Sequence, residues 1–293
     1  MAHRAKLLRL PGHGKLLVSA DLHGNYRDFL TIAHRFERLG EDAHLLFLGD
    51  LVHGPYLPLS QWPHDVPPGH PLAGRPYCDE SPAVLLGVQL LLSRYPGRVH
   101  VLLGNHEHAH IGGPRTALFA RDEATALEQR IGIEASLHMA SFFRSLPIVA
   151  WAPCGLFFSH AAPACELVRI EDIEGIDYRR YIAPRRTDKP RTAKSNKPGE
   201  LAARLLGQLL WEHVLPPFKA QSLLARVGAQ VAVYGHTIIP TGYQAIGYEQ
   251  LILSTSFGMH DQHKTLLLLD LDEHYLSVDS IRPGIELLPL YER

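Results

Sequence analysis

The chain is poor in cysteine: it has three in 293 residues, and no two of them form a Cys-x-x-Cys pair. Their odd number argues against a disulfide scaffold and favours a reducing compartment, so we expect a cytoplasmic protein. No apolar run approaches the roughly 20 residues that cross a bilayer. The polar N-terminus also lacks the apolar stretch of a signal peptide, so no membrane partner is expected.

The sequence also lacks an excess of charge of either sign. It carries 29 Lys and Arg against 30 Asp and Glu, a formal net charge of -1. A globally basic nucleic-acid binder is therefore not expected. Apolar residues make up 46% of the chain, which is ample for a sizeable core. Histidine is abundant, with 19 copies, and this abundance points to a metal site.

Apolar periodicity predicts a β-α-β-α-β order in the first half of the chain. The predicted strands cover 15–20, 44–49 and 98–103, and the predicted helices cover 26–39 and 84–95. This order indicates an α/β fold, with helical crossovers between strands of one sheet. In the second half we expect helices over 124–146 and 200–213, and strands over 147–151, 155–159, 231–234, 251–254, 265–270 and 274–279.

Two stretches interrupt this pattern. Residues 55–82 are rich in proline, glycine and histidine, and residues 179–199 hold eight basic side chains and one acid, Asp188. Segments of this kind inside a compact domain are usually lids, binding loops or disordered. We interpret the chain as a single domain over 1–293, with an insertion near 55–82 and a basic loop near 179–199.

Most of the predicted strands end in oxygen or imidazole donors. Five such clusters follow strands, at 21–25, 49–53, 104–107, 159–163 and 234–237. Taken singly, each residue has an ordinary structural explanation, because Asp50 could cap a helix and His160 could be a core histidine. Ligands collect at the carboxyl ends of strands in α/β sheets, so five clusters in this order predict a metal site.

The residue types suit two divalent cations. Such a pair can clamp the attacking and leaving oxygens of a phosphoryl displacement, and a carboxylate can bridge the ions. Imidazole ligands favour transition metals over calcium or magnesium. We therefore expect two divalent ions, manganese in the first place, with iron or zinc as alternatives.

Two motifs carry a family resemblance. Asp21-Leu-His-Gly24 and Gly104-Asn-His-Glu107 resemble the first and third motifs of the calcineurin-like metallophosphoesterase superfamily. The chain is most similar to its phosphoprotein phosphatase branch, which acts on phosphoserine and phosphothreonine, and to bacterial diadenosine tetraphosphate hydrolases. The resemblance implies a four-layer α/β sandwich, in which two mixed sheets are flanked by helices and carry the site at one rim.

The resemblance also implies a role for each matching residue. Asp21 and His23 would bind the first metal, Asp50 would bridge, and Asn105, His160 and His236 would bind the second. A metal-held hydroxide would attack phosphorus. His106 would be the general acid that protonates the leaving alcohol, a role worth typically 10²–10⁴-fold in rate.

The second motif departs from the family. It reads Gly49-Asp-Leu-Val-His-Gly-Pro55, one residue short and without the arginine that grips phosphate in the family. His53 could take the place of a carboxylate beside His106, or of the arginine with one hydrogen bond to phosphate, or could cap a turn. Other candidates for phosphate binding are Asn105, Arg115, Arg185 and Arg186. We interpret His108 and His110 as exposed residues on the cleft rim.

The leading hypothesis is a dinuclear phosphoesterase that hydrolyses phosphate monoesters and is similar to serine/threonine protein phosphatases. Its partner would be a phosphorylated protein or a small phosphoester. A dinucleoside polyphosphate hydrolase is the alternative within the superfamily. A pseudo-phosphatase, which would hold a phosphoprotein without turnover, is the alternative from another class.

Overall fold

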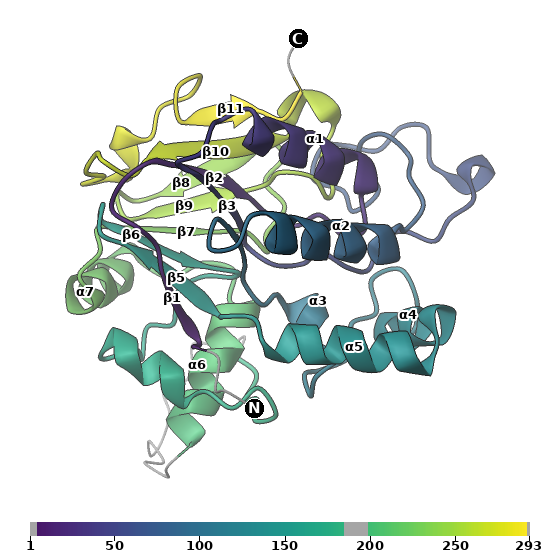
Figure 1. The fold of residues 1–293 in the computed structure, drawn as a ribbon, viewed down its shortest axis with the longest axis horizontal. Coiled ribbons are helices and arrows are strands. Elements are labelled where there is room, and N and C mark those ends of the chain that lie inside the picture. The colour runs from purple at the N-terminus through teal and green to yellow at the C-terminus, as the bar shows by residue number, and fades with distance from the viewer. Residues whose placement is uncertain (1–4, 185–198, 292–293) are drawn as a thin grey trace.

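The computed structural model describes residues 5–184 and 199–291, and within these it contains two β-sheets (Figure 1). The first sheet has the strand order β11 (Leu287–Pro289), β10 (Thr265–Asp270), β2 (Lys15–Ser19), β3 (Ala43–Phe47) and β4 (Val99–Val101). The second has the order β1 (Leu7–Arg9), β5 (Val149–Ala152), β6 (Leu156–Ser159), β7 (Val231–Tyr234), β9 (Gln250–Leu253) and β8 (Tyr243–Ile246). Both sheets mix parallel and antiparallel pairs.

The parallel strands determine at which edge of each sheet the site lies. In the first sheet β2, β3 and β4 are parallel, with α1 (Tyr26–Glu37) and α2 (Ser81–Arg94) as crossovers. In the second sheet β6, β7 and β9 are parallel, and α6 (Glu200–Trp211) and α7 (Pro217–Val227) connect β6 to β7. The predicted β-α-β-α-β order of the first half is therefore confirmed, and the carboxyl ends within each parallel set share one edge.

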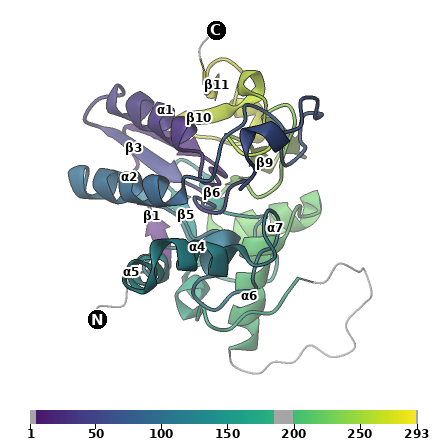
Figure 2. The ribbon, with the colours of Figure 1, turned by 90° about the vertical axis from the view of Figure 1, so that its right-hand side faces the viewer.

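The two sheets pack face to face. Alternate residues such as Leu16, Val18 and Leu46 form one buried cluster with residues of the second sheet such as Phe158 and Val233. The opposite faces of the sheets are covered by helices. In Figure 2, α1 and α2 lie on one side of the sheets, and α6 and α7 lie on the other. This confirms the predicted four-layer α/β sandwich.

The helical stretch predicted over 124–146 is divided into two helices. α4 (Glu123–Ile131) is capped by Asp122, whose side chain accepts the N–H of Thr125, and α5 (Ile133–Arg144) follows directly. Gly132 separates them with a φ of 83°, which a glycine adopts at little cost. The short helix α3 (Asn105–His108), at the start of the third motif, has no counterpart in the sequence prediction.

The prediction of a strand over 274–279 is wrong. The N–H groups of Tyr275 and Val278 donate to the carbonyls of Cys154 and Tyr248, so the segment has no neighbouring strand in a ladder. Burial in this segment does not alternate: Tyr275 and Val278 are buried, Leu276 between them is exposed, and the irregular segment ends in a short 3₁₀-helix. β1, β8, β11 and α7 were not predicted, and the three strands are only three or four residues long.

The 3₁₀-helices are η1 (Leu59–Gln61), η2 (Ile170–Gly175), η3 (Asp261–His263) and η4 (Val278–Ser280). η1 is the one helical element between Pro55 and Glu80 in the predicted insertion. Most of the predicted basic loop, residues 185–198, lies outside the described residues. Within the described part of the chain, every helix is too short or too polar to span a bilayer.

Candidate metal centre

The strands of both sheets deliver the predicted site residues to one place. Asp21 and His23 follow β2, Asp50 follows β3, and Asn105 begins the helix that follows β4. The second sheet contributes two residues, His160 directly after β6 and His236 two residues after β7. Because the sheets pack face to face, these five loops meet at one rim, as predicted.

The backbone at this rim is strained. Within residues 5–184 and 199–291, the non-glycine residues with a positive φ are Asp21, His23, Asp50, His53 and His236, with values between 46° and 67°. Each such conformation costs of the order of 1–3 kcal/mol and persists only where the surrounding structure holds it. All five lie in the loops of the candidate site, which is where strain of this kind is typically concentrated.

Two glycines let the loops approach one another closely. A Cβ atom at Gly235 would lie 2.5 Å from Oδ2 of Asp21, and one at Gly104 would collide with Oδ1 and the backbone N of Asp50. Any side chain at either position would push the loop away from the facing carboxylate. Gly104 and Gly235 therefore allow the loops that carry the donors to come close to one another.

The donors form two groups that share Asp50. Oδ2 of Asp50 lies 3.5 Å from Nε2 of His23 and 3.4 Å from Nε2 of His160. On the His160 side, Oδ1 of Asn105 lies 2.7 Å from Nε2 of His160 and 3.1 Å from Nδ1 of His236. The carboxylate of Asp21 accepts the backbone N–H of His236, at 3.0 Å. The six predicted ligands are thus joined by one connected set of contacts, in which Asp50 lies between His23 and His160.

The histidines present unprotonated nitrogens to this centre. Nδ1 of His23 lies 3.0 Å from the carbonyl oxygen of His53, and Nδ1 of His160 lies 3.1 Å from the carbonyl oxygen of Leu48. A carbonyl oxygen only accepts hydrogen bonds, so both rings carry their hydrogen on Nδ1. In the neutral rings Nε2 then bears the lone pair, which is the arrangement that orients a metal-ligating histidine. The donor set fits divalent transition-metal ions.

Burial shifts the protonation of these groups towards their uncharged forms. It raises the pKa of Asp21 to about 8 and that of Asp50 well above its usual range, and the nearby Glu107 carboxylate adds to both shifts. It also lowers the pKa of His23 to about 4 and that of His160 to about 3. Buried carboxylates of this kind gain most from a compensating cation, and neutral imidazoles are the form that binds a metal.

Glu107 joins the second and third motifs, although the sequence analysis gave it no role. Its carboxylate accepts the backbone N–H groups of Asp50 at 2.8 Å, Leu51 at 2.7 Å and Gly104 at 3.0 Å. The loop that carries Asp50 is thereby fixed to the helix that carries Asn105. The signal for this role was its place as the fourth residue of the Gly-Asn-His-Glu motif.

His53 lies against His106. Nδ1 of His53 is 2.9 Å from Nδ1 of His106, and both rings are buried. His106 lines the cavity at the metal centre, whereas His53 contacts His106 from behind and is not part of the cavity wall. Of the three places predicted for His53, the observed one is the position beside His106.

The prediction that His108 and His110 are exposed is wrong. Both rings are buried, and each has a polar partner in the interior. Nε2 of His108 donates to the carbonyl of Tyr178 at 2.7 Å, and Nδ1 of His110 lies 2.7 Å from Oε1 of Glu128. The sequence gave no sign of these partners, which lie 70 and 18 residues away. His110 consequently belongs to the interior behind the site.

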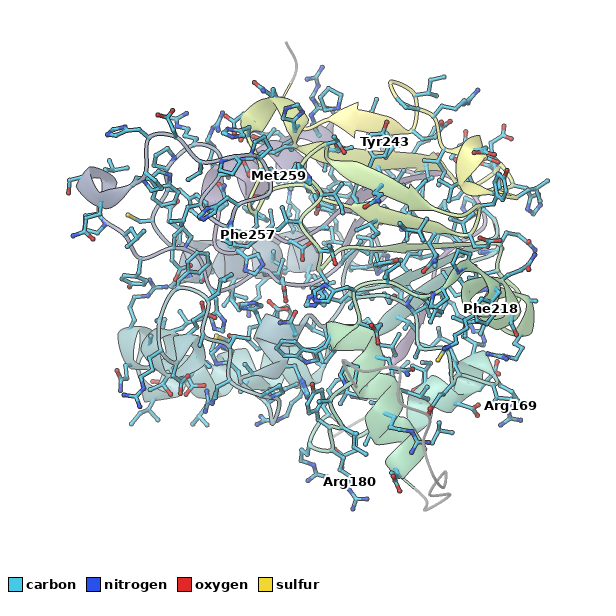
Figure 3. The ribbon with its side chains drawn as sticks, turned by 180° about the vertical axis from the view of Figure 1, so that it is seen from behind. Arg169, Arg180, Phe218, Tyr243, Phe257 and Met259 are labelled. Atoms are coloured by element: carbon cyan, nitrogen blue, oxygen red, sulfur yellow. The ribbon has the colours of Figure 1, made fainter. Side chains whose placement is uncertain are left out.

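A cavity of about 440 Å³ opens over the metal centre. Its walls are mainly apolar beyond the donors, with Pro71, Leu118, Trp211, Ile238 and Phe257 among the lining residues. Phe257, labelled in Figure 3, lies with its ring centroid 4.1 Å from that of His23. Arg115 also lines the cavity and pairs with Glu128 at 3.4 Å. Arg185 and Arg186, the other predicted phosphate ligands, lie outside the described residues.

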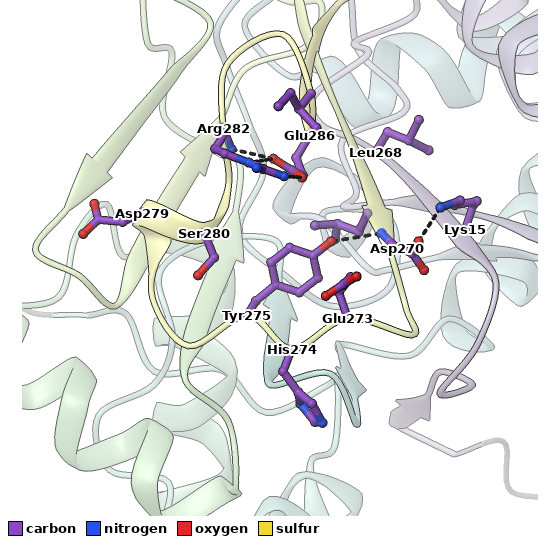
Figure 4. A pocket seen from close by; sticks show the side chains of 12 residues that line it. Lys15, Leu268, Asp270, Glu273, His274, Tyr275, Asp279, Ser280, Arg282 and Glu286 are labelled. Carbon is purple, nitrogen blue, oxygen red and sulfur yellow. Dashed lines mark hydrogen bonds and ion pairs between the residues drawn. The ribbon is translucent and has the colours of Figure 1, made fainter.

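A second cavity, of about 700 Å³, lies beside β10, away from the metal centre (Figure 4). Lys15 pairs with Asp270, and Arg282 pairs with Glu286, so its basic side chains are already matched with acids. The donor groups that could hold a metal among the described residues do not include any residue of this cavity. Among the described residues, the side chains that could hold a metal therefore lie at and behind the rim where the strands end.

Residues 14–240 match the family model of the calcineurin-like phosphoesterases. The match covers more than half of the chain, so the protein belongs to this family and is a phosphoric ester hydrolase. The resemblance seen in the motifs is therefore confirmed.

Solved structures have the same fold. One is a protein serine/threonine phosphatase from Saccharomyces cerevisiae, with a TM-score of 0.59, 15% sequence identity, and coverage of 91% of this chain and 77% of that one. Another is a cold-active protein-tyrosine phosphatase of a psychrophilic Shewanella species, with a TM-score of 0.56, 15% identity, and coverage of 91% and 79%. At this level of identity the likeness concerns the fold alone.

Proposed function

We propose that the protein is a dinuclear-metal phosphomonoesterase similar to serine/threonine protein phosphatases, with manganese as its metal and iron or zinc as alternatives. The observation that carries the proposal is the shared carboxylate: Oδ2 of Asp50 lies 3.4–3.5 Å from an imidazole nitrogen on either side. A single oxygen between two donor groups suits a ligand that bridges two cations.

In this proposal Asp21 and His23 hold one ion, and Asn105, His160 and His236 hold the other. When bound, the cations supply Lewis acidity that polarises the phosphoryl group and lowers the pKa of a water molecule. Glu107 keeps the bridging loop in place through its three backbone contacts. Its loss would weaken metal binding by about 10- to 100-fold, as is typical of partners behind the ligands.

His106 is the proposed general acid. Its Nε2 lies 4.0 Å from Oδ2 of Asp50, on the cavity side of the ring. As the oxygen of water forms the new bond to phosphorus and loses one proton to solvent, the bond to the ester oxygen breaks. His106, protonated on both nitrogens at this stage, gives the ester oxygen its proton from Nε2. An alcohol is released with inorganic phosphate, and the imidazole is reprotonated by solvent before the next turnover.

The cavity supports a monoester substrate. Arg115 is the one lysine or arginine among the described residues that line it, and it is the proposed phosphate ligand together with the side-chain amide of Asn105. The apolar walls suit the uncharged side chain that carries a phosphate in a protein. A dinucleoside polyphosphate would bring several further negative charges to these walls, so we place that substrate second.

A substrate panel on manganese-loaded protein tests the proposal. It compares phosphoserine, phosphothreonine and phosphotyrosine peptides, p-nitrophenyl phosphate and diadenosine tetraphosphate. We expect the highest kcat/KM for phosphoserine or phosphothreonine peptides. Preference for the dinucleotide would support the alternative hydrolase, and inactivity towards every substrate with manganese, iron and zinc would support the binding protein.

A further inference from the structure

Behind His106 lies a row of buried imidazoles that ends at a carboxylate on α4. Nε2 of His53 is 2.9 Å from Nε2 of His110, and Nδ1 of His110 is 2.7 Å from Oε1 of Glu128. With the 2.9 Å contact between His53 and His106, these distances form one continuous chain of hydrogen bonds. We call it the histidine chain; it consists of His106, His53, His110 and Glu128.

The direction of each hydrogen bond follows from the carboxylate end. A carboxylate only accepts, so Nδ1 of His110 carries the hydrogen, and Nε2 of the neutral ring is an acceptor. His53 must then donate from Nε2, which leaves its Nδ1 to accept from Nδ1–H of His106. The neutral ring of His106 is thereby fixed with Nδ1 protonated and Nε2 on the side of Asp50, at 4.0 Å. Nε2 is then the nitrogen that takes up a proton from solvent and gives it to the leaving oxygen.

The carboxylate of Glu123 lies beside the histidine chain. Its Oε1 accepts the backbone N–H groups of Leu118 at 3.0 Å and Phe119 at 2.6 Å. Its Oε2 is buried without a hydrogen bond, 3.6 Å from Nδ1 of His106 and 3.8 Å from Nδ1 of His53. These distances are too long for good hydrogen bonds, so Glu123 contributes charge near the chain, and the hydrogen bonds run to Glu128.

We infer that His110 and Glu128 are positioning residues that act through His53 to fix the tautomer and orientation of His106. They take over a task for which the second motif has no carboxylate of its own at His53. The inference rests on the proposed function, because it concerns the group that protonates the leaving alcohol. It adds α4 and the end of the third motif to the parts of the chain that serve the reaction.

The test compares esters that differ in their need for a general acid. Phenyl phosphate releases a poor leaving group that requires protonation, whereas p-nitrophenyl phosphate releases a good one. We expect His110→Leu and Glu128→Leu to lower kcat for phenyl phosphate by about 10- to 100-fold, part of what general acid catalysis supplies. For p-nitrophenyl phosphate, kcat should fall by less than about 3-fold in His110→Leu, and the metal content should not change in either variant. Glu128→Leu also removes the partner of Arg115, so for this variant the ratio of the two kcat values is compared with that of the wild type.

Two further variants make the comparison specific. His110→Gln should retain most of the activity towards phenyl phosphate, because its amide oxygen can accept the hydrogen bond from His53. His108→Leu is the matched control, since His108 is equally buried but donates to Tyr178 and makes no contact with His53. Its ratio of the two kcat values should equal that of the wild type, because any loss of folded protein lowers both rates together.

Nitrogen NMR of labelled histidine in zinc-loaded protein gives a readout that is independent of activity. We expect neutral His106 to carry its hydrogen on Nδ1 in the wild type and to lose this preference in His110→Leu and Glu128→Leu. An unchanged tautomer and an unchanged kcat ratio in both variants would overturn the inference. A changed ratio in Glu123→Gln alone would assign the positioning to Glu123 instead. Wild-type inactivity towards both esters would contradict the proposed function, whereas the tautomer would still test the histidine chain.

Discussion

Nδ1 of His53 lies 2.9 Å from Nδ1 of His106, so the residue that departs from the family's second motif is in direct contact with the proposed general acid. The left-handed backbone of His53, with a φ of 67°, turns its ring into this position. This contact is one link of the histidine chain, and the carboxylate of Glu123 lies beside it, 3.6 Å from Nδ1 of His106. The altered second motif therefore changes the hydrogen-bond partner of His106, whereas the metal donors still lie together.

His53→Asp tests this relationship. An aspartate at this position would offer a carboxylate towards Nδ1 of His106, so we expect kcat for phosphomonoesters to stay within about 3-fold of the wild type or to rise. His53→Ala removes the hydrogen-bond partner and should lower kcat for poor leaving groups by about 10-fold or more. Steady-state kinetics with phenyl phosphate distinguishes the two. Equal losses in both variants would show that no carboxylate can replace the imidazole.

His106→Ala separates proton transfer from metal binding. We expect kcat for phosphoserine peptides to fall by about 10²–10⁴-fold, because an alkoxide leaves poorly without a proton. The metal content should stay at the wild-type level, since His106 is not one of the six proposed ligands. Elemental analysis beside the kinetics checks both expectations. Loss of metal in this variant would instead make His106 a ligand.

Asp28→Ala tests the stability of the fold away from the centre. Oδ2 of Asp28 lies 2.7 Å from Nζ of Lys264, and both side chains are almost completely buried. Removing the acid leaves the ammonium with one partner, Asp261 at 2.9 Å, and leaves the hydroxyls of Ser256 and Tyr291 without their acceptor. We therefore expect the free energy of unfolding to fall by about 3 kcal/mol. Denaturant titration measures the loss. Glu171→Ala is the control, because it breaks the exposed pair with Arg9 and should change the free energy by less than about 1 kcal/mol.

His100 on β4 should make the protein sensitive to acid. Burial lowers its pKa to about 4, and the neighbouring His44 adds to the shift. Above pH 6.5 the ring is neutral in both the folded and unfolded states, so the free energy of unfolding does not depend on it. As the pH falls from 6.5 towards 4, the unfolded chain takes up a proton that the folded protein does not, and stability is lost.

His100→Leu should remove this part of the pH dependence, a difference of about 3 kcal/mol between pH 7 and pH 4. Chemical denaturation at a series of pH values gives the slope for each protein. His274→Leu replaces an exposed histidine and should keep the wild-type slope. Identical slopes in the wild type and His100→Leu would show that the ring does not resist protonation in the folded state.

The sequence predicted the donors because each directly follows a strand or lies within a few residues of one. Asp21 and Asp50 follow apolar runs whose periodicity is plain, and parallel strands bring such ends together. The sequence did not predict the residues behind the donors. Glu128 and Glu123 come from a helix that begins after a long loop, and only the packing of α4 against the third motif brings them to His110 and His106.

The prediction of a strand over 274–279 failed for a related reason. Apolar residues at short intervals indicate that some side chains point inwards, but they do not say whether a neighbouring strand is present to pair with the backbone. Tyr275 is buried because its hydroxyl accepts the N–H of Asp270 at 2.9 Å, a contact that a turn can provide as well as a strand. Short strands such as β1 were missed because three residues carry too little periodicity to register.

The central claim is that Asp50 is shared by two cations, and the metal content of purified protein tests it most directly. Elemental analysis of the manganese-loaded wild type should give about two ions per chain, together with hydrolysis of p-nitrophenyl phosphate. Asp50→Asn should bind fewer ions and lose activity, because a neutral amide bridges cations poorly. Full activity with one ion or none per chain, or an Asp50→Asn protein that retains both ions and its activity, would contradict the account.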